Sequence, residues 1–150
     1  MFGDRTVTDF KMSLYDGKPH LSLILLSSMG EKTKEESGGF ILDDSYAIRS
    51  KIRMSSPPGM INMHEFNVRN QSQSALMALW RPTYYDNSEF DATQPVGWIG
   101  DTGFREVNVD THEVVFDWKS LDHIKPLESV QSPPKMPGAF YDPWDYLYVS

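Results

Sequence analysis

Residues 97–124 read GWIGDTGFREVNVDTHEVVFDWKSLDHI and contain two alternating segments on either side of a tight turn. Apolar side chains recur at every second position of these segments, at Val107 and Val109 before the turn and at Val114, Phe116 and Trp118 after it. A period of two is the pattern of a half-buried β-hairpin. Behind the hairpin, Asp122 and His123 bring a carboxylate and an imidazole into a loop. This stretch therefore predicts a scaffold that leads directly into a candidate site.

Outward from this hairpin, short apolar segments bounded by turn residues occur along the whole chain. We expect strands at residues 6–15, 20–26, 40–42, 46–54, 63–68, 75–80, 105–109, 114–118 and 144–149. Residues 83–96 are expected to form a long loop, because Arg81-Pro82 ends the apolar segment before them. No helix of ordinary length is expected. Strands joined mostly as hairpins predict an all-β meander.

The spacing of these strands favours one architecture. Grouped in fours, they form units of roughly 40 to 50 residues, which is the spacing of propeller blades. Propellers usually close with about four blades or more, whereas this chain supplies only about three units of that length. We therefore expect a single domain, residues 1–150, built from antiparallel four-stranded blades of an incomplete β-propeller.

Composition excludes several classes of function. Fourteen basic and twenty-one acidic residues give a net charge of −7, so the chain would repel a nucleic-acid backbone. The longest apolar run, residues 23–26, is far too short to span a membrane. The absence of cysteine and the scattered positions of the four histidines predict neither a metal nor another cofactor. The first residues lack the apolar core of a signal peptide, and the compartment stays open.

Several segments together resemble a known family. Residues 97–124 are similar to GWILDGxFQEIDIxTGEVLFEWxSLDHV, a segment of the fungal branch of the arylsulfotransferase (ASST-like) family. Residues 8–19, GGFILDDSY at 38–46, His64-Glu65-Phe66 and residues 142–146 follow in the family's order. The resemblance covers essentially the whole chain, but only the N-terminal half or less of a family member.

This resemblance implies a β-propeller with a central funnel. The bacterial relatives transfer a sulfuryl group from one phenol to another through a histidine intermediate, and activity in the fungal branch is an extrapolation from them. Histidine is nucleophilic near neutral pH, and the three sulfuryl oxygens need cationic or hydrogen-bonding neighbours. The expected ligand is therefore an aryl sulfate or a phenolic small molecule.

The resemblance also nominates site residues. The two histidines in matching motifs, His64 and His123, are the candidate catalytic groups. The candidate substrate-binding residues are Trp98, Asp122, Trp144 and Tyr148. The alternatives are a local backbone contact for His64, loop packing for His123, and for Trp118 a place in the core. Arg81 and Arg105 could bind sulfate, but the surface is the commoner place for arginine. His112 is expected in a turn with positive φ, because the family usually has glycine there.

Departures from the family pattern weaken the prediction of catalysis. Tyr148 stands where the family has histidine, and Ser150 where it has asparagine. Tyrosine has a pKa near 10 and cannot supply a cationic imidazole at neutral pH. We therefore expect an arylsulfotransferase-like fragment that is inactive alone and that self-associates through unclosed blade edges. Two alternatives stay open. One is a module that binds a small molecule, a glycan or a protein, and the other is a gene whose missing exons encode the remaining blades.

Overall fold

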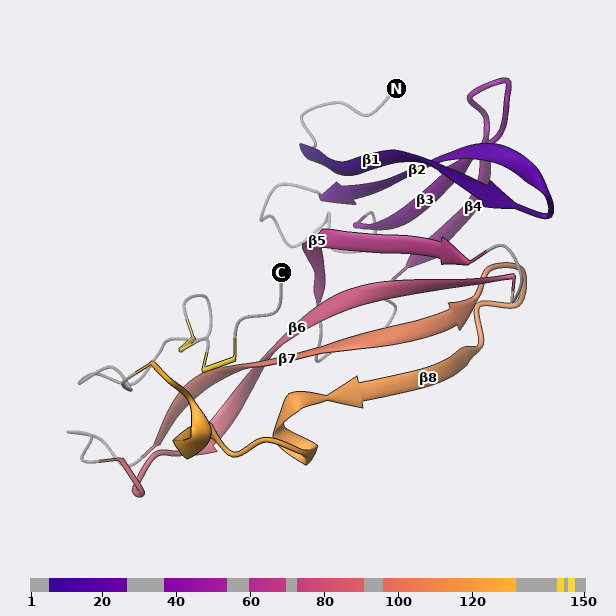
Figure 1. The fold of residues 1–150 in the computed structure, drawn as a ribbon. Coiled ribbons are helices and arrows are strands. Elements are labelled where there is room, and N and C mark those ends of the chain that lie inside the picture. Colours follow the sequence, from indigo (N-terminus) through magenta and orange to yellow (C-terminus); the bar gives the residue numbers. More distant parts are fainter. Residues whose placement is uncertain are drawn as a thin grey trace.

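Eight strands form two four-stranded antiparallel sheets in the protein (Figure 1). The structure is a computed structural model and describes residues 6–26, 37–53, 60–69, 73–90, 96–131, 143–144 and 146–147. Within these residues the only helices are two short 3-10 turns. The prediction of an all-β meander is therefore confirmed.

Within each sheet, every strand pairs with the next one along the chain. The first sheet contains β1 (Thr6–Tyr15), β2 (Lys18–Leu26), β3 (Gly38–Leu42) and β4 (Ile48–Arg53). The second contains β5 (Met60–Arg69), β6 (Ser74–Asp86), β7 (Val96–Asn108) and β8 (Val114–Lys119). The 3-10 turns η2 (Ser120–Asp122) and η3 (Pro126–Glu128) follow β8. Each of the eight strands predicted between residues 6 and 118 corresponds to one of these strands, in the same order.

Tight turns join the strands where the sequence predicted them. Asp16 and Gly17 have φ angles of 50° and 70°, and positive φ at both central positions is what a two-residue hairpin turn requires. His112 has a φ of 62° in the β7–β8 turn, so the prediction of a turn residue with positive φ is confirmed. The side chain of Asn108 supports this turn by accepting the backbone N–H groups of Asp110 and Thr111, each at 2.9 Å.

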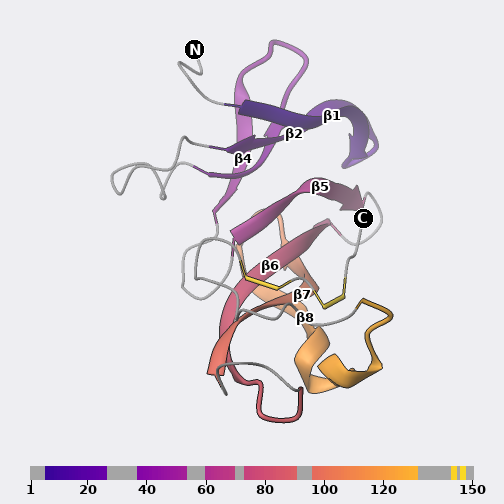
Figure 2. The same cartoon turned by 90° about the vertical axis from the view of Figure 1, so that its left-hand side faces the viewer.

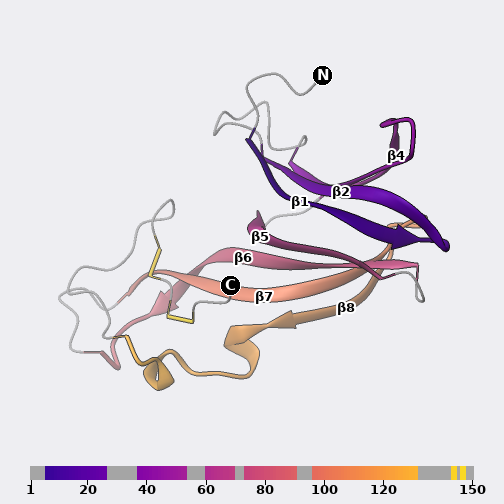
Figure 3. The same ribbon diagram turned by 45° about the horizontal axis from the view of Figure 1, so that its top comes forward.

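The two sheets pack face to face, and Figures 2 and 3 show them as two layers. The shared core consists of Tyr15, Ile24, Ile41 and Ile52 from the first sheet and Ile61, Phe66, Ala75, Met77, Leu79, Val107 and Val109 from the second. Phe66 is fully buried against Gly39, where an added Cβ would lie 2.3 Å from the Phe66 ring. Gly39 thus allows the sheets to approach closely. Four-stranded meanders packed in this way are consistent with propeller blades.

The first sheet is also buried on its other face. Leu23, Leu25, Phe40 and Leu42 form a second apolar cluster there. Because side chains alternate along a strand, these residues interleave with Ile24 and Ile41 of the shared core. The centre of β2 is therefore buried on both faces.

Two predicted boundaries are wrong in the second sheet, namely the end of β6 and the start of β7. β6 does not end at Pro82 but pairs with β7 as far as the partners Asp86 and Val96. Cross-strand aromatic packing explains the extension, because Tyr84 lies opposite Trp98 with ring centroids 5.3 Å apart. The predicted long loop at residues 83–96 therefore begins only after Asp86.

The hairpin that opened the sequence argument also differs from prediction at its second strand. β8 is an edge strand, and Val114 and Phe116 are 55% and 46% exposed. Trp118 is half-buried and belongs to neither apolar cluster. The alternation predicted a buried face, but in the described part of the chain no further sheet covers it. The last predicted strand is represented by one parallel bridge between Trp144 and Ile99.

Candidate functional site

A pair of β-bulges brings His64 and its neighbours out of the regular ladder. In β5, Ile61 pairs with Leu79 and Phe66 with Met77, so residues 62–65 lie opposite a single residue of β6. Bulges re-aim side chains and are common beside functional sites. This bulge contains three polar residues in addition to Met63, namely Asn62, His64 and Glu65.

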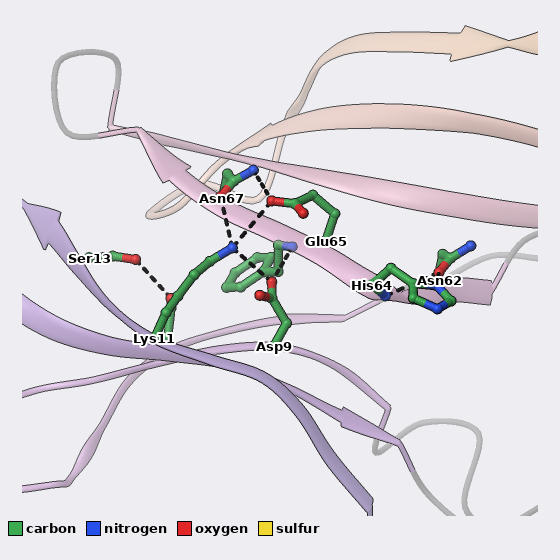
Figure 4. Close-up of polar contacts among 9 residues, drawn as sticks. Asp9, Lys11, Ser13, Asn62, His64, Glu65 and Asn67 are labelled. Carbon is green, nitrogen blue, oxygen red and sulfur yellow. Dashed lines mark hydrogen bonds and ion pairs between the residues drawn. The ribbon is translucent and has the colours of Figure 1, made fainter. Parts of the chain in front are cut away.

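A second bulge lies in β1, which packs beside β5. The pairing shifts between Thr8 and Lys11, and Asp9 within the shift has a φ of 47°. The carboxylate of Asp9 accepts the backbone N–H of Phe66 at 2.6 Å, where the β5 ladder resumes. Each bulge therefore supports the other across the two sheets. We call this region the β1–β5 junction, and its polar residues are Asp9, Lys11, Asn62, His64, Glu65 and Asn67 (Figure 4).

Lys11 is the centre of the junction's hydrogen bonding. Its ammonium lies 3.0 Å from the Asp9 carboxylate and 3.3 Å from that of Glu65, and it donates to the Asn67 side-chain oxygen at 2.8 Å. The Asn67 amide nitrogen also donates to Glu65. The Lys11 side chain is 31% exposed, so the cluster is open to water on one side. Its positive charge is already shared between two carboxylates.

Asn62 fixes the orientation of the His64 ring. The Asn62 side-chain oxygen accepts the backbone N–H of His64 at 3.1 Å and also contacts ring atom Nδ1 (Figure 4). An amide oxygen only accepts hydrogen bonds, so Nδ1 must carry the proton in this contact. The neutral ring then has its lone pair on Nε2. His64 is exposed, and it lies nearer the start of β5 than Asn67 of the Lys11 cluster (Figure 4).

His123 lies in a different environment, at the end of an aromatic stack. Its ring is parallel to Trp118 with centroids 5.2 Å apart, and Trp118 is parallel to Phe104 at 5.0 Å. Phe116 extends the stack at 6.0 Å from Phe104. Asp122 is exposed in η2 beside it. We call Phe104, Phe116, Trp118 and His123 the aromatic stack.

A buried hydrogen-bond network anchors the loop that carries His123. Ser120 is fully buried and donates to Asp101 at 2.9 Å, while it accepts the Tyr146 hydroxyl at 2.8 Å. Burial raises the pKa of Tyr146 to about 12, with Asp101 adding to the effect, so this hydroxyl stays a donor at any physiological pH. Two of the segments that carry the family resemblance, residues 97–124 and 142–146, therefore meet here, through residues that fix the loop rather than through His123 itself.

The two candidate tryptophans are neighbours. The backbone N–H of Trp144 donates to the Trp98 carbonyl at 3.1 Å, and Gly100 donates to the Trp144 carbonyl at 2.8 Å. The Trp144 ring meets the Phe90 ring edge-on at 5.3 Å. The Trp144 indole N–H is buried and meets no hydrogen-bond acceptor among the described residues. Tyr148, the remaining candidate, lies outside the residues that the structure describes.

The structure thus groups the predicted site residues into separate places. Trp98 lies beside Trp144, and Asp122 lies beside His123. His64 belongs to β5 and His123 follows β8, and these strands form the opposite edges of the second sheet (Figure 1). The two candidate catalytic histidines are therefore not brought together by this sheet.

Sequence reasoning missed Asp9, Lys11 and Asn62. Both bulges interrupt the alternation of side chains, so the period-two pattern carries no information about which residues face the junction. The one available signal was the family-like segment at residues 8–19, which contains Asp9 and Lys11.

The prediction that Arg81 lies at the surface is wrong. Arg81 is only 3% exposed, and its guanidinium lies 2.7 Å from Asp117, which also accepts two hydrogen bonds from Arg105 at 3.0 and 3.1 Å. Burial alone would raise the pKa of Asp117, but the hydrogen bond from Arg105 and the charges of both arginines outweigh burial and lower it. A shared carboxylate partner makes the burial of Arg81 tolerable.

The described residues show neither a metal site nor a membrane-spanning helix. They contain no group of three or more His, Asp or Glu side chains with the geometry of a metal site. No helix in this part of the chain has the length and apolarity needed to cross a membrane.

Comparison with known proteins gives one match. Residues 39–150 match the model of the arylsulfotransferase (ASST) family, which is most of the chain. Neither a curated protein nor a solved structure matches the sequence. The matched residues include β4–β8, and with them His64, the aromatic stack and the buried network around Ser120. The chain therefore belongs to the arylsulfotransferase (ASST) family.

Proposed function

We propose that this chain contributes the His64 portion of an arylsulfotransferase-like site that takes an aryl sulfate. The observation that carries the proposal is the contact between Asn62 and His64 at the β5 bulge. In the neutral ring this contact favours the tautomer with the proton on Nδ1 and the lone pair on Nε2, which is the arrangement a nucleophilic imidazole needs. The family membership of residues 39–150 supplies the class of reaction.

In this proposal His64 accepts and then returns the sulfuryl group. Nε2 attacks the sulfur of the aryl sulfate, the S–O bond to the ring breaks, and the phenolate leaves with the bonding electron pair. In the second half, the oxygen of an acceptor phenol attacks sulfur and gives its proton, through solvent, to the phenolate released in the first half. The S–N bond breaks, and its electron pair returns to Nε2. The sulfuryl oxygens stay negatively charged throughout, so the step needs cationic or hydrogen-bonding groups around them.

We propose that the chain does not turn over substrate alone, and the charges of the junction support this. Lys11 is the cation at the junction, and Asp9 and Glu65 already hold its ammonium. A sulfate ester that approached would therefore meet two carboxylates as well as one ammonium. We propose that further cations come from other blades of a propeller of which these sheets are a part.

Propeller placement is supported by the way the sheets are built. Both are four-stranded meanders, they share one core, and the first strands of each, β1 and β5, pack beside one another. We propose that the two sheets are adjacent blades of an incomplete propeller. We further propose that copies of the chain associate through β8, because its exposed residues Val114, Val115 and Phe116 are 55%, 62% and 46% accessible on an edge strand.

A combined assay tests the proposed role of His64. The protein is incubated with 4-nitrophenyl sulfate and an acceptor phenol, and binding of the sulfate ester is measured in parallel by calorimetry. We expect no release of nitrophenol, and we expect His64→Ala to weaken binding about tenfold, because the contact between the imidazole ring and the ester is lost. His123→Ala is the matched control and should bind as the parent does. Turnover by the parent protein would contradict the proposal that the chain is inactive alone. Unchanged binding by His64→Ala would contradict the proposal that the aryl sulfate binds at His64.

A binding module is the second candidate function, and the aromatic stack favours it. Trp118 lies between Phe104 and His123, and one end of the stack is exposed at Phe116. Flat aromatic surfaces of this kind bind aromatic or sugar rings by stacking. Neutral glycans and phenols that bind the parent protein and lose affinity in Trp118→Ala, but not in His64→Ala, would favour this function over sulfuryl transfer.

A further inference from the structure

Two apolar surfaces of the protein face away from the core that the sheets share. The first lies on the outer face of the first sheet, where Met12 pairs with Leu21, Leu21 with Leu42 and Leu42 with Ile48. This line of side chains crosses all four strands, and we call it the Met12 row. Met12 is 73% exposed and Ile48 is 50% exposed, whereas Leu21 and Leu42 between them belong to the second apolar cluster or pack against it. The row is therefore apolar throughout and open to solvent at both ends.

The apolar surface continues beyond the row. Leu14 is 52% exposed and lies two residues farther along β1, on the same face. Tyr46 is 66% exposed in the turn between β3 and β4, where its φ is 62°. The Tyr46 backbone N–H donates to the Asp43 carbonyl at 3.0 Å, and that of Ala47 donates to the Asp43 carboxylate at 2.9 Å. Positive φ is uncommon for a bulky residue, so this hydrogen-bonded turn holds an exposed tyrosine in an unusual conformation beside the row.

The second surface is the aromatic stack, on the outer face of the second sheet. Phe104 pairs across the strands with Trp118 on one side and with Ala78 on the other. Because Ala78 lies between two residues of the shared core, these three side chains face away from that core. Both rings are half-buried, and Phe116 in the same stack is 46% exposed. The stack and the Met12 row therefore lie on the outer sides of two different layers (Figure 3).

The two surfaces are complementary in chemistry. The row is aliphatic, with the flexible thioether of Met12 as its most exposed part, whereas the stack consists of flat rings. Methionine adapts its shape to a neighbour, and its sulfur makes favourable contacts with aromatic rings. The two sheets of one chain already pack through side chains of these kinds, since Ile24 and Met77 share a core with Phe66. The row and the stack of two copies can therefore bury one another as the inner faces of one copy do.

Charged residues beside the two surfaces differ in net sign. The turns next to the Met12 row carry three aspartates and one lysine, namely Asp16, Asp43, Asp44 and Lys18. Residues 119–125, which lead away from the stack, carry two lysines and one aspartate, namely Lys119, Lys125 and Asp122. Because the whole chain has a net charge of −7, two copies repel one another in most orientations. The orientation that brings the acidic turns to residues 119–125 is favoured over the others.

We propose that copies of this chain associate head to tail, with the aromatic stack of one copy packed on the Met12 row of the next. This contact presupposes the proposed association through β8, and it identifies the surface that β8 meets. A contact between two different surfaces leaves a stack free at one end of a dimer and a row free at the other, so further copies can add. Pairing between two β8 edges would instead join identical surfaces and stop at two copies.

Two variants that each disable one surface test the proposal, with sedimentation velocity and native mass spectrometry as the measurements. Met12→Lys disables the row and Phe116→Lys disables the stack. Each should weaken self-association about tenfold, because a charge enters an apolar contact. When the two variants are mixed, with one of them labelled with nitrogen-15, the intact stack of the first should bind the intact row of the second. The result is a mixed dimer to which no third copy adds. Met63→Lys, at an exposed methionine of β5 outside both surfaces, is the matched control and should associate as the parent does.

A parent protein that stays monomeric would overturn both the head-to-tail contact and the proposed association through β8. If the parent associates and Met12→Lys associates equally well, or if the two folded variants form no mixed dimer, the head-to-tail contact is wrong while association through β8 stands. Leu14→Lys, at a second exposed position of the same surface, repeats the test if thermal melting shows that Met12→Lys is unstable. His64→Ala should associate as the parent does, which separates the assembly from binding of the sulfate ester at His64.

Discussion

The β1–β5 junction and the aromatic stack each hold one of the two candidate histidines, and they are built in opposite ways. The junction is polar and belongs to both sheets, because two bulges meet there and Asp9 binds the backbone of β5. The stack is apolar and belongs to one sheet, with His123 lying flat on Trp118. In the junction, the ring of His64 is oriented by its contact with Asn62. In the stack, the ring of His123 packs in parallel on Trp118.

This difference teaches that two histidines in family-like motifs can lie in unlike surroundings. The loop of His123 is held by Ser120, Asp101 and Tyr146, which are buried, while His123 is exposed. That motif is explained by the anchoring of a loop. The motif of His64 is explained by the bulge and by Asn62, which position a ring toward solvent.

The largest expected difference between the two regions is in stability. Phe66→Ala should cost about 3–5 kcal/mol of unfolding free energy, because Phe66 is fully buried between the sheets and packs on Gly39. Trp118→Ala should cost only about 1–2 kcal/mol, because that ring is half-buried on one sheet. Urea unfolding of both variants measures this. Equal costs would show that the junction is not more deeply supported than the stack.

The next effect concerns the polar part of the junction. Lys11→Met should destabilise the protein by about 1–2 kcal/mol, because it leaves Asp9, Glu65 and Asn67 without the ammonium that they share. Lys18→Met, at an exposed lysine of the neighbouring strand, is the control and should change stability by less than about 0.5 kcal/mol. Thermal melting distinguishes them. A neutral Lys11→Met would mean that the cluster does not tie the two sheets together.

A substitution in β8, the strand that carries Phe116 and Trp118 of the aromatic stack, should have an effect of similar or smaller size. This effect is on self-association and not on folding. Val115→Lys should weaken self-association about tenfold, or about 1.4 kcal/mol, because a charge on an edge strand opposes pairing with a second copy. Glu113→Lys, in the turn beside β8, should have little effect. Sedimentation velocity over a concentration series gives the association constant. A parent protein that stays monomeric at every concentration would remove β8 as an interface.

The smallest expected effect is on the pH dependence of the two regions. The pKa of Asp117 is lowered in the folded protein, so its contribution to stability is present above the ordinary aspartate value near 4 and is lost as the pH falls through the lowered pKa. Hydrogen exchange at low pH should therefore increase in β8, where Asp117 binds Arg81 and Arg105. Asp117→Asn should lose this acid response while β5 exchanges as in the parent.

The fold was largely predictable from the sequence, whereas the site was only partly so. Alternation and turn residues located the eight strands, and the positive φ of His112 was expected because the family that the sequence resembles has glycine there. The exposure of Val114 and Phe116 was not predictable, because alternation reports a face but not what covers it. The junction was not predictable either, because it depends on two bulges and on contacts between residues more than fifty positions apart.

Arg81 shows the same limit from another side. Nothing in its local sequence indicates burial, since an arginine before a proline at the end of an apolar segment is usually exposed. The partner that makes its burial tolerable, Asp117, is 36 positions away and on a strand that Arg81's own strand does not pair with. Composition and periodicity carry no information about such a pairing.

NMR titration of the histidine side chains with 4-nitrophenyl sulfate tests the central claim most directly, which is that His64 is the functional histidine. In the protein without ligand, the account predicts that the His64 ring carries its proton on Nδ1. Addition of the ligand should shift the Nε2 resonance, and Asn62→Ala should abolish or greatly reduce this shift. The His123 resonances should stay unchanged. A response at His123 with none at His64, or a free His64 ring protonated on Nε2 alone, would contradict the account.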